Sequence, residues 1–192
     1  MTNILLLDNM DSFVYNLVDQ LRNNSCNVII FRNTLSYNLI IKKLKNIKNP
    51  ILMLSPGPGI PSKSGCMPKL IKILKGYIPI IGICLGYQAI VELYGGNIEK
   101  SKVIIHGQSS QIKHDNKYMF YGLPNPLSVA RYHSFICNNI PNLLTINSKF
   151  NDTVMSVRDN KNKICGFQFH PESIMTTQGT LLIKQTINWV KY

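Results

Sequence analysis

The chain has 192 residues, with 21 Lys and Arg against 9 Asp and Glu, and 45% of its residues are hydrophobic. This length suffices for one domain, expected to span residues 1–192, with a core that buries roughly 70% of the extended chain's surface. No apolar run reaches the ~18 residues that span a membrane, and Ile4–Leu7 is too short for a signal-peptide core. The five cysteines are widely spaced and form no C-x-x-C pattern, so we expect reduced thiols and a cytoplasmic location.

The formal net charge of +12 raises the question of a nucleic-acid partner. The lysines, however, lie in helix-like stretches such as Lys42–Lys48 and Lys63–Lys75. No aromatic residues are interleaved with them to stack on bases. We therefore expect the lysines to form a solvated surface and expect no nucleic-acid partner.

The first half of the chain alternates short apolar runs with longer amphipathic stretches. Four β-branched-rich runs predict buried parallel strands: Ile4–Leu7, Val28–Phe31, Ile51–Leu54 and Ile78–Ile83. The stretches near them predict helices over Phe13–Asn23, Leu39–Lys48, Met67–Lys75 and Gln88–Tyr94. Asp11 and Ser12 are possible N-terminal caps of the first helix, and Gly95-Gly96 ends the last. This alternation predicts an α/β fold with an open, doubly wound sheet.

The second half contains strand-like runs separated by turn-rich segments. These runs are Val103–Ile105, Leu127–Ala130, Val154–Val157 and Ile164–Phe169. A closing amphipathic helix is expected over Leu181–Tyr192. The complete prediction is a mostly parallel sheet with flanking helices and an additional antiparallel β section in the second half.

Cys84 is the first candidate for chemistry, within Gly82-Ile83-Cys84-Leu85-Gly86. This G-x-C-x-G pattern follows an apolar strand and begins a helix, as in a nucleophile elbow. The two glycines permit a sharp turn, and the partial positive charge of a helix N-terminus favours a thiolate. The backbone N–H of Leu85 is a candidate oxyanion donor. The alternative is a buried structural cysteine beside a glycine turn.

His170 has the best surroundings for a base, in Phe167-Gln168-Phe169-His170-Pro171-Glu172. The predicted strand Ile164–Phe169 brings the imidazole to its end, and Pro171 blocks further ladder pairing. Glu172, two residues on, can accept a hydrogen bond from the imidazole and fix its tautomer. The alternative is a histidine at a strand end with a solvated carboxylate.

A third feature is the loop Ser55-Pro56-Gly57-Pro58-Gly59, directly after the predicted strand Ile51–Leu54. Alternating Pro and Gly make a stiff loop whose amides can approach a ligand closely. Gly57 is the best candidate for a second oxyanion donor, a contact that typically stabilises a transition state by about 2.7–4 kcal/mol. The alternative is an ordinary rigid turn. Open α/β sheets place their sites at the carboxyl edge of the strands, where this loop and Cys84 are both expected.

Together these motifs resemble those of the class I (triad) glutamine amidotransferases over essentially the whole chain. The segments that carry the resemblance are Leu6–Phe13, Ser55–Gly59, Gly82–Gln88 and Phe167–Ser173. Within that family the chain is similar to the glutaminase subunit, component II, of anthranilate synthase, through Ala130–Ser134 and Ser173–Gly179. Two departures are Tyr87, where the family often has His, and Phe135, where Leu is usual.

The resemblance implies a role for each matching residue. Cys84 would attack the side-chain amide of L-glutamine, with His170 as base and then acid and Glu172 orienting it. The backbone amides of Gly57 and Leu85 would hold the oxyanion. The residues implied in glutamine binding are Gly57, Pro58, Gly59, Gln88, Ser134 and Phe135. His106 and His114 have no ligand-spaced partners, so no metal site is expected.

The resemblance also implies a partner, the large, chorismate-binding component I of anthranilate synthase. The complex would be a heterodimer or heterotetramer that makes anthranilate for tryptophan biosynthesis. No cofactor is expected in this chain, and any Mg²⁺ would belong to the partner. The nearest alternative is the amidotransferase subunit of aminodeoxychorismate synthase in the folate pathway, or a subunit used by both enzymes. Further alternatives are a glutaminase for carbamoyl phosphate or GMP synthesis and a catalytically silent scaffold subunit.

Overall fold

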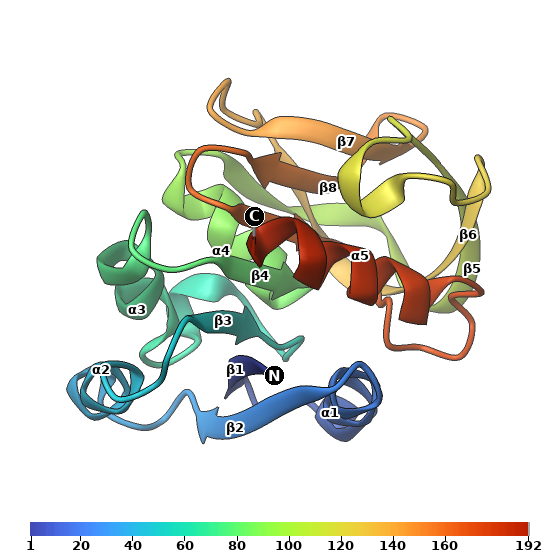
Figure 1. The fold of residues 1–192 in the computed structure, drawn as a ribbon. Coiled ribbons are helices and arrows are strands. Elements are labelled where there is room, and N and C mark those ends of the chain that lie inside the picture. Colours follow the sequence, from blue (N-terminus) through green and yellow to red (C-terminus); the bar gives the residue numbers. More distant parts are fainter. Residues whose placement is uncertain (192) are drawn as a thin grey trace.

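A computed structural model describes residues 1–191, with the side chains of residues 102–104 outside the description. Within that part, the chain forms nine strands and five α-helices (Figure 1). The strands are β1 Thr2–Asp8, β2 Cys26–Arg32, β3 Pro50–Leu54, β4 Ile80–Ile83, β5 Asn97–His114, β6 Leu127–Asn138, β7 Thr145–Phe150, β8 Thr153–Asp159 and β9 Ile164–Phe167. The helices are α1 Val14–Asn23, α2 Tyr37–Leu44, α3 Met67–Leu74, α4 Leu85–Leu93 and α5 Gly179–Lys191, with short 3₁₀ turns at Pro61–Lys63 and Tyr118–Phe120.

The strands form one sheet in the order β2-β1-β3-β4-β9-β8-β7-β5-β6. The first five in this order run parallel, and the remaining pairings are antiparallel. The predicted fold class is therefore confirmed, including the antiparallel section in the second half. None of the helices in residues 1–191 is long and apolar enough to cross a membrane.

Helices cover both faces of the parallel part of the sheet. Along β1, Ile4 and Leu6 pack into one hydrophobic core with α1 and α5, whereas Leu5 and Leu7 pack into a second core with α2, α3 and α4. Figure 1 shows α1 and α5 on one side of these strands and α2 and α3 on the other. Side chains alternate across a strand, so burial on both faces explains why this run is continuously apolar.

Several element boundaries differ from the sequence prediction. Helix α4 begins at Leu85 and not at Gln88, helix α2 ends at Leu44 and not at Lys48, and β9 ends two residues before Phe169. Strand β7 was not predicted, because its buried positions are polar: Asn147 and Ser148 are satisfied by the hydroxyl of Ser156 at 2.6 Å each.

The ends of α1 and α4 and the extent of strand β5 can also be compared with the elements predicted from the sequence. Asp11 Oδ2 accepts the N–H of Phe13 at 2.9 Å, just before α1. Gly95 ends α4 with φ +96°, as expected. The predicted strand Val103–Ile105 lies within the longer β5, with the side chains of residues 102–104 outside the described part. Tyr192, the predicted last residue of the closing helix, also lies outside the described residues.

The contact between α4 and β3 leads to a stability prediction. A Cβ atom on Gly86 would lie 2.6 Å from Leu54 Cβ and 2.7 Å from Leu54 O, inside a buried strand. Gly86→Ala should therefore lower the free energy of unfolding by roughly 1–3 kcal/mol through overpacking. Gly95→Ala, where a Cβ meets open space, should lose only about 1 kcal/mol, from its positive φ. Urea denaturation of both variants tests this, and equal stability of Gly86→Ala and the unmodified chain would contradict it.

Candidate active site

Four parallel strands end at one level of the sheet. Residue pairing aligns Leu7 with Leu54 across β1 and β3, and Leu54 with Gly82 across β3 and β4. It also aligns Ile83 with Phe167 across β4 and β9. The residues that follow these strands therefore meet at one carboxyl edge, where open α/β sheets hold their ligands.

Cys84 occupies a sharp turn between β4 and α4. Its backbone lies at φ 50°, ψ −99°, a conformation that costs of order 1–3 kcal/mol in a non-glycine residue. The turn brings Gly82 against the backbone of Gly86, where a Cβ on Gly82 would lie at only 2.5 Å. Both glycines of the G-x-C-x-G pattern are therefore needed for close packing. The Cys84 side chain is 7% exposed and lines a cavity.

The chain brings His170 to the same edge by leaving β9 early. After Phe167 it leaves the sheet ladder, and His170 forms an isolated bridge with Ala130 of β6, donating its N–H to Ala130 O at 3.0 Å. The hydroxyl of Thr176 donates to His170 O at 2.6 Å. Glu172 Oε1 lies 2.6 Å from His170 Nδ1, with both residues buried. The carboxylate therefore accepts a hydrogen bond from the Nδ1–H, which leaves Nε2 as the ring nitrogen without a partner.

Glu172 strongly affects the pKa of the buried His170 beside it. Burial alone would lower the pKa of His170, but the Glu172 carboxylate and the adjacent Cys84 sulfur outweigh it, so the pKa is raised well above its ordinary value. Among the described residues, His170 Nε2 and Glu172 Oε2 have no hydrogen-bond partner although both are buried. An imidazole nitrogen that has no hydrogen-bond partner and lies next to a cysteine is suited to exchange a proton with a bound substrate.

A cavity of about 1040 Å³ opens over these groups. Its lining includes Cys84, His170, Glu172, Gly57 and Pro58, five of the predicted site residues. Four other predicted glutamine contacts, Gly59, Gln88, Ser134 and Phe135, are not among its lining residues. The lining also includes Met10, Asp11, Ser12 and Phe13, which follow β1. The antiparallel section contributes His106 and Tyr132.

The loop that carries Gly57 is held by Asn9, which follows β1. The N–H of Asn9 donates to Ser55 Oγ at 2.8 Å, and its amide Nδ2 donates to Ser55 O at 2.9 Å. A Cβ on Gly57 would lie 2.6 Å from both Asn9 Cβ and Asn9 O, and 3.0 Å from Leu85 Cδ2. The two predicted oxyanion donors, Gly57 and Leu85, therefore belong to neighbouring segments.

Gln88 contacts the backbone of Phe135. Gln88 Nε2 donates to Phe135 O at 3.4 Å and to Gln168 Oε1 at 3.3 Å. The same carbonyl faces His133 Nδ1 at 3.0 Å, while Arg131 Nε donates to His133 Nε2 at 3.1 Å. Burial and the Arg131 charge lower the pKa of His133 to about 4, so this imidazole is neutral.

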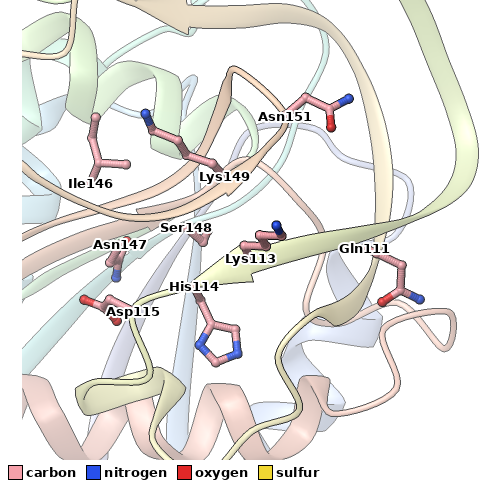
Figure 2. Close-up of a pocket in the computed structure, with 9 residues that line it drawn as sticks. All are labelled: Gln111, Lys113, His114, Asp115, Ile146, Asn147, Ser148, Lys149 and Asn151. Carbon is pink, nitrogen blue, oxygen red and sulfur yellow. The ribbon is translucent and has the colours of Figure 1, made fainter.

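A second, smaller cavity of about 440 Å³ lies between the end of β5 and β7 (Figure 2). His114 in its wall is already engaged: its Nε2 lies 2.9 Å from Pro124 O, and its Nδ1 accepts the N–H of Asn116 at 3.1 Å. Lys113 and Lys149 beside it are exposed. We assign no reactive group to this cavity. Among the described residues, no group of three or more His, Cys, Asp and Glu is arranged to hold a metal ion.

Three residues of the site were not identified from the sequence. Gln168 Nε2 donates to Cys84 Sγ at 3.6 Å, and Tyr132 O lies 3.9 Å from the same sulfur. The Tyr132 ring lies 5.1 Å from that of His170, in a T-shaped arrangement. Asn9 holds the Gly57 loop. Each belongs to a motif segment quoted from the sequence, but only the pairing of distant strands reveals its contacts.

Comparison with known proteins places this chain in a family. The family model for class-I glutamine amidotransferases matches residues 5–189. Anthranilate synthase component 2 of Buchnera aphidicola subsp. Schizaphis graminum is 63% identical over 98% of this chain and 96% of its own length. A multifunctional tryptophan biosynthesis protein of Pichia angusta is 40% identical over 97% of this chain but only 51% of its own length.

The fold is shared with solved structures of low identity. A protein from Thermoplasma acidophilum, described as one of the subunits of GMP synthase, superposes with a TM-score of 0.86 at 24% identity, covering 100% of this chain and 94% of that one. The family match, over residues 5–189, covers nearly the whole chain. The chain belongs to the class-I glutamine amidotransferase family.

Proposed function

We propose that this chain is the glutaminase subunit of anthranilate synthase. It hydrolyses L-glutamine through a glutamyl thioester on Cys84 and supplies ammonia to the chorismate-binding component I, for tryptophan biosynthesis. The observation that carries the proposal is the buried contact of His170 with Glu172 beside Cys84, in a chain 63% identical to an anthranilate synthase component 2. The whole chain, 1–192, would act as a single amidotransferase domain.

The reaction follows from the positions of three side chains. The Cys84 thiolate attacks the amide carbon of glutamine, and the backbone N–H groups of Gly57 and Leu85 stabilise the oxyanion. When the C–N bond breaks, imidazolium His170 gives its Nε2 proton to the leaving nitrogen, which departs as ammonia. Water then attacks the thioester, with His170 taking its proton, and glutamate leaves as the sulfur is released. Glu172 holds the imidazole in the required tautomer throughout.

Glutamine would lie in the large cavity with its side chain toward Cys84. We propose that Gly57, Pro58 and Gly59 bind it on one side, and that Gln88 and the backbone at Ser134 and Phe135 contribute on the other. Gln88 is buried and donates a hydrogen bond to the backbone carbonyl of the half-buried Phe135 at 3.4 Å, so these two positions are already linked. No step requires a cofactor in this chain, and any Mg²⁺ would belong to component I.

The rim of the cavity offers a docking surface for component I. Three large apolar side chains line the cavity and remain solvent-exposed: Met10 at 56%, Phe13 at 61% and Ile174 at 99%. Exposed apolar residues grouped around a functional opening are typical of an interaction site. We propose that component I covers this rim, in a heterodimer or heterotetramer, and receives ammonia directly from the cavity. The five free cysteines favour a cytoplasmic location for the complex.

Removing the nucleophile should separate the two half-reactions. Cys84→Ser should abolish glutamine-dependent anthranilate formation by the complex, because a serine hydroxyl lacks the thiolate that attacks the amide. Anthranilate synthesis from added ammonium salts should be unchanged, since it needs only component I. The measurement is product formation with each nitrogen source after co-purification. Loss of both activities would contradict the division of labour.

The same assay distinguishes the folate-pathway alternative. With component I of aminodeoxychorismate synthase as the partner, formation of aminodeoxychorismate in place of anthranilate would favour that enzyme. Formation of anthranilate with one large subunit and of aminodeoxychorismate with the other would indicate that both enzymes use this chain. No alkylation of Cys84 by a glutamine-analogue affinity label, even in the complex, would indicate a silent scaffold.

Removing the Glu172 charge should change the pH dependence of glutamine hydrolysis. The carboxylate raises the pKa of His170, so Glu172→Gln should lower it and leave less imidazolium to protonate the leaving nitrogen at neutral pH. The high-pH limb of the kcat/KM profile should therefore move to lower pH, and kcat at neutral pH should fall about 10²-fold. A profile that keeps the position of its high-pH limb would argue against an electrostatic role for Glu172.

A charge on the apolar rim should weaken the complex. Ile174→Asp should raise the Kd for component I by at least ~10-fold, because it buries an unpaired carboxylate in the proposed interface. Leu143→Asp is the matched control, since Leu143 is 71% exposed and lies away from the cavity. Calorimetric titration of component I with both variants measures the difference. Equal affinities would place the interface elsewhere.

A further inference from the structure

We infer that Gln168 donates a hydrogen bond to the Cys84 sulfur that stabilises the thiolate, and that Gln88 fixes the Gln168 amide in the donating orientation. This gives Gln168 contact with the reacting atom and makes Gln88 a positioning residue as well as a glutamine contact. The inference rests on the proposed role of Cys84 as nucleophile.

The contact follows from the register of the two strands. Ile83 and Phe167 are partners in the parallel pairing of β4 with β9, and the N–H of Cys84 donates to Phe167 O at 2.7 Å. Cys84 and Gln168 are therefore the first residues beyond the paired positions. The N–H of Gln168 donates to Met155 O at 2.8 Å, which anchors its backbone to β8. Gln168 Nε2 then lies 3.6 Å from Cys84 Sγ, a hydrogen-bond distance for sulfur.

The orientation of the side-chain amides of Gln88 and Gln168 follows from the backbone carbonyl of Phe135, with which Gln88 is in contact. Phe135 O can only accept, so the amide group of Gln88 that faces it, at 3.4 Å, must be the NH₂. The same NH₂ lies 3.3 Å from the Gln168 amide, which must present its oxygen there. The NH₂ of Gln168 is thereby directed at Cys84 Sγ. Because the Phe135 carbonyl has no proton to donate, neither amide can be flipped without losing one of these hydrogen bonds.

The Phe135 carbonyl is itself held in place. The Arg131 guanidinium can only donate, so His133 accepts at Nε2 and carries its proton on Nδ1. That N–H donates to Phe135 O at 3.0 Å. The low pKa of His133 agrees with this single neutral tautomer. A buried cation thus orients a line of dipoles that ends at the nucleophile.

The charge state of the sulfur decides which of its neighbours stabilises it. Tyr132 O, 3.9 Å away, can accept only from the protonated thiol. The Gln168 N–H favours the thiolate, because a hydrogen bond to an ionised acceptor is about twice as strong as a neutral one. Gln168 is fully buried, so water does not compete for this donor.

Alkylation of the full chain by iodoacetamide at pH 7 tests the inference. Gln168→Met keeps the length of the side chain and removes the donor, so the rate constant for labelling Cys84 should fall about tenfold. Gln111→Met, at an exposed position of β5, is the matched control and should label at the unmodified rate. Burial raises the pKa of the other four thiols, so they remain protonated, and peptide mass analysis confirms the labelled site.

Steady-state kinetics of the complex give a second readout. Gln168→Met should lower kcat for glutamine about tenfold and leave KM within about twofold, because the lost contact acts on the sulfur and not on bound glutamine. A fall in kcat with unchanged alkylation would mean that Gln168 is only structural and would overturn the inference. Alkylation of Gln168→Met at the unmodified rate would overturn it as well.

The outcomes separate this inference from the proposed function. If Cys84 of the unmodified chain is not labelled, the proposed nucleophile itself is wrong. If it is labelled equally in Gln168→Met, only the role of Gln168 is wrong. Thermal unfolding checks that Gln168→Met is folded. If it is not, Gln88→Met carries the test: it frees the Gln168 amide to rotate and should slow labelling about threefold, and an unchanged rate would overturn the inference.

Discussion

The parallel pairing of β4 with β9 is the constraint on which the site depends. It places Cys84 and Gln168 side by side, although 84 positions separate them along the chain. Strand β9 ends at Phe167, two residues short of Phe169, where the sequence predicted its end. This early end allows His170 to pair with Ala130 of β6. The antiparallel section is thus more than an extension of the sheet, because it turns the imidazole toward the nucleophile supplied by the parallel half.

The site is locally unfavourable and is maintained by the fold around it. Cys84 has a positive φ, and the buried pair of His170 and Glu172 leaves one polar atom of each residue without a partner in the described part of the chain. Such features cost free energy, and they persist only where surrounding packing determines the conformation. Here the apolar cores on both faces of β4 provide that packing. Of these two unpaired atoms, His170 Nε2 is the one at which proton transfer takes place in the proposed reaction.

The fold class and the motif positions were predictable from the sequence, because they depend on local patterns. The apolar runs of β1 to β4 and the glycines around Cys84 report directly on burial and turn geometry. Strand β7 was missed, since its buried positions carry Asn147 and Ser148, which pair with another strand's hydroxyl. Gln168 was missed for a related reason: its contacts depend on the register between distant strands. Local pattern therefore locates the reactive groups, whereas long-range pairing determines what surrounds them.

The size of the cavity links the chemistry to assembly. At about 1040 Å³ it lies at the upper end of the range of small-molecule sites, and glutamine, an amino acid, fills only part of it. Water in the remaining volume would weaken the electrostatic contacts that stabilise the oxyanion and would compete for ammonia. Met10, Phe13 and Ile174 surround this volume with apolar surface that gains from being covered. A partner seated on the rim would thus exclude bulk water from the cavity, leaving only the water that hydrolyses the thioester, and would open a path for ammonia. The same burial that stabilises the complex would then also make hydrolysis productive.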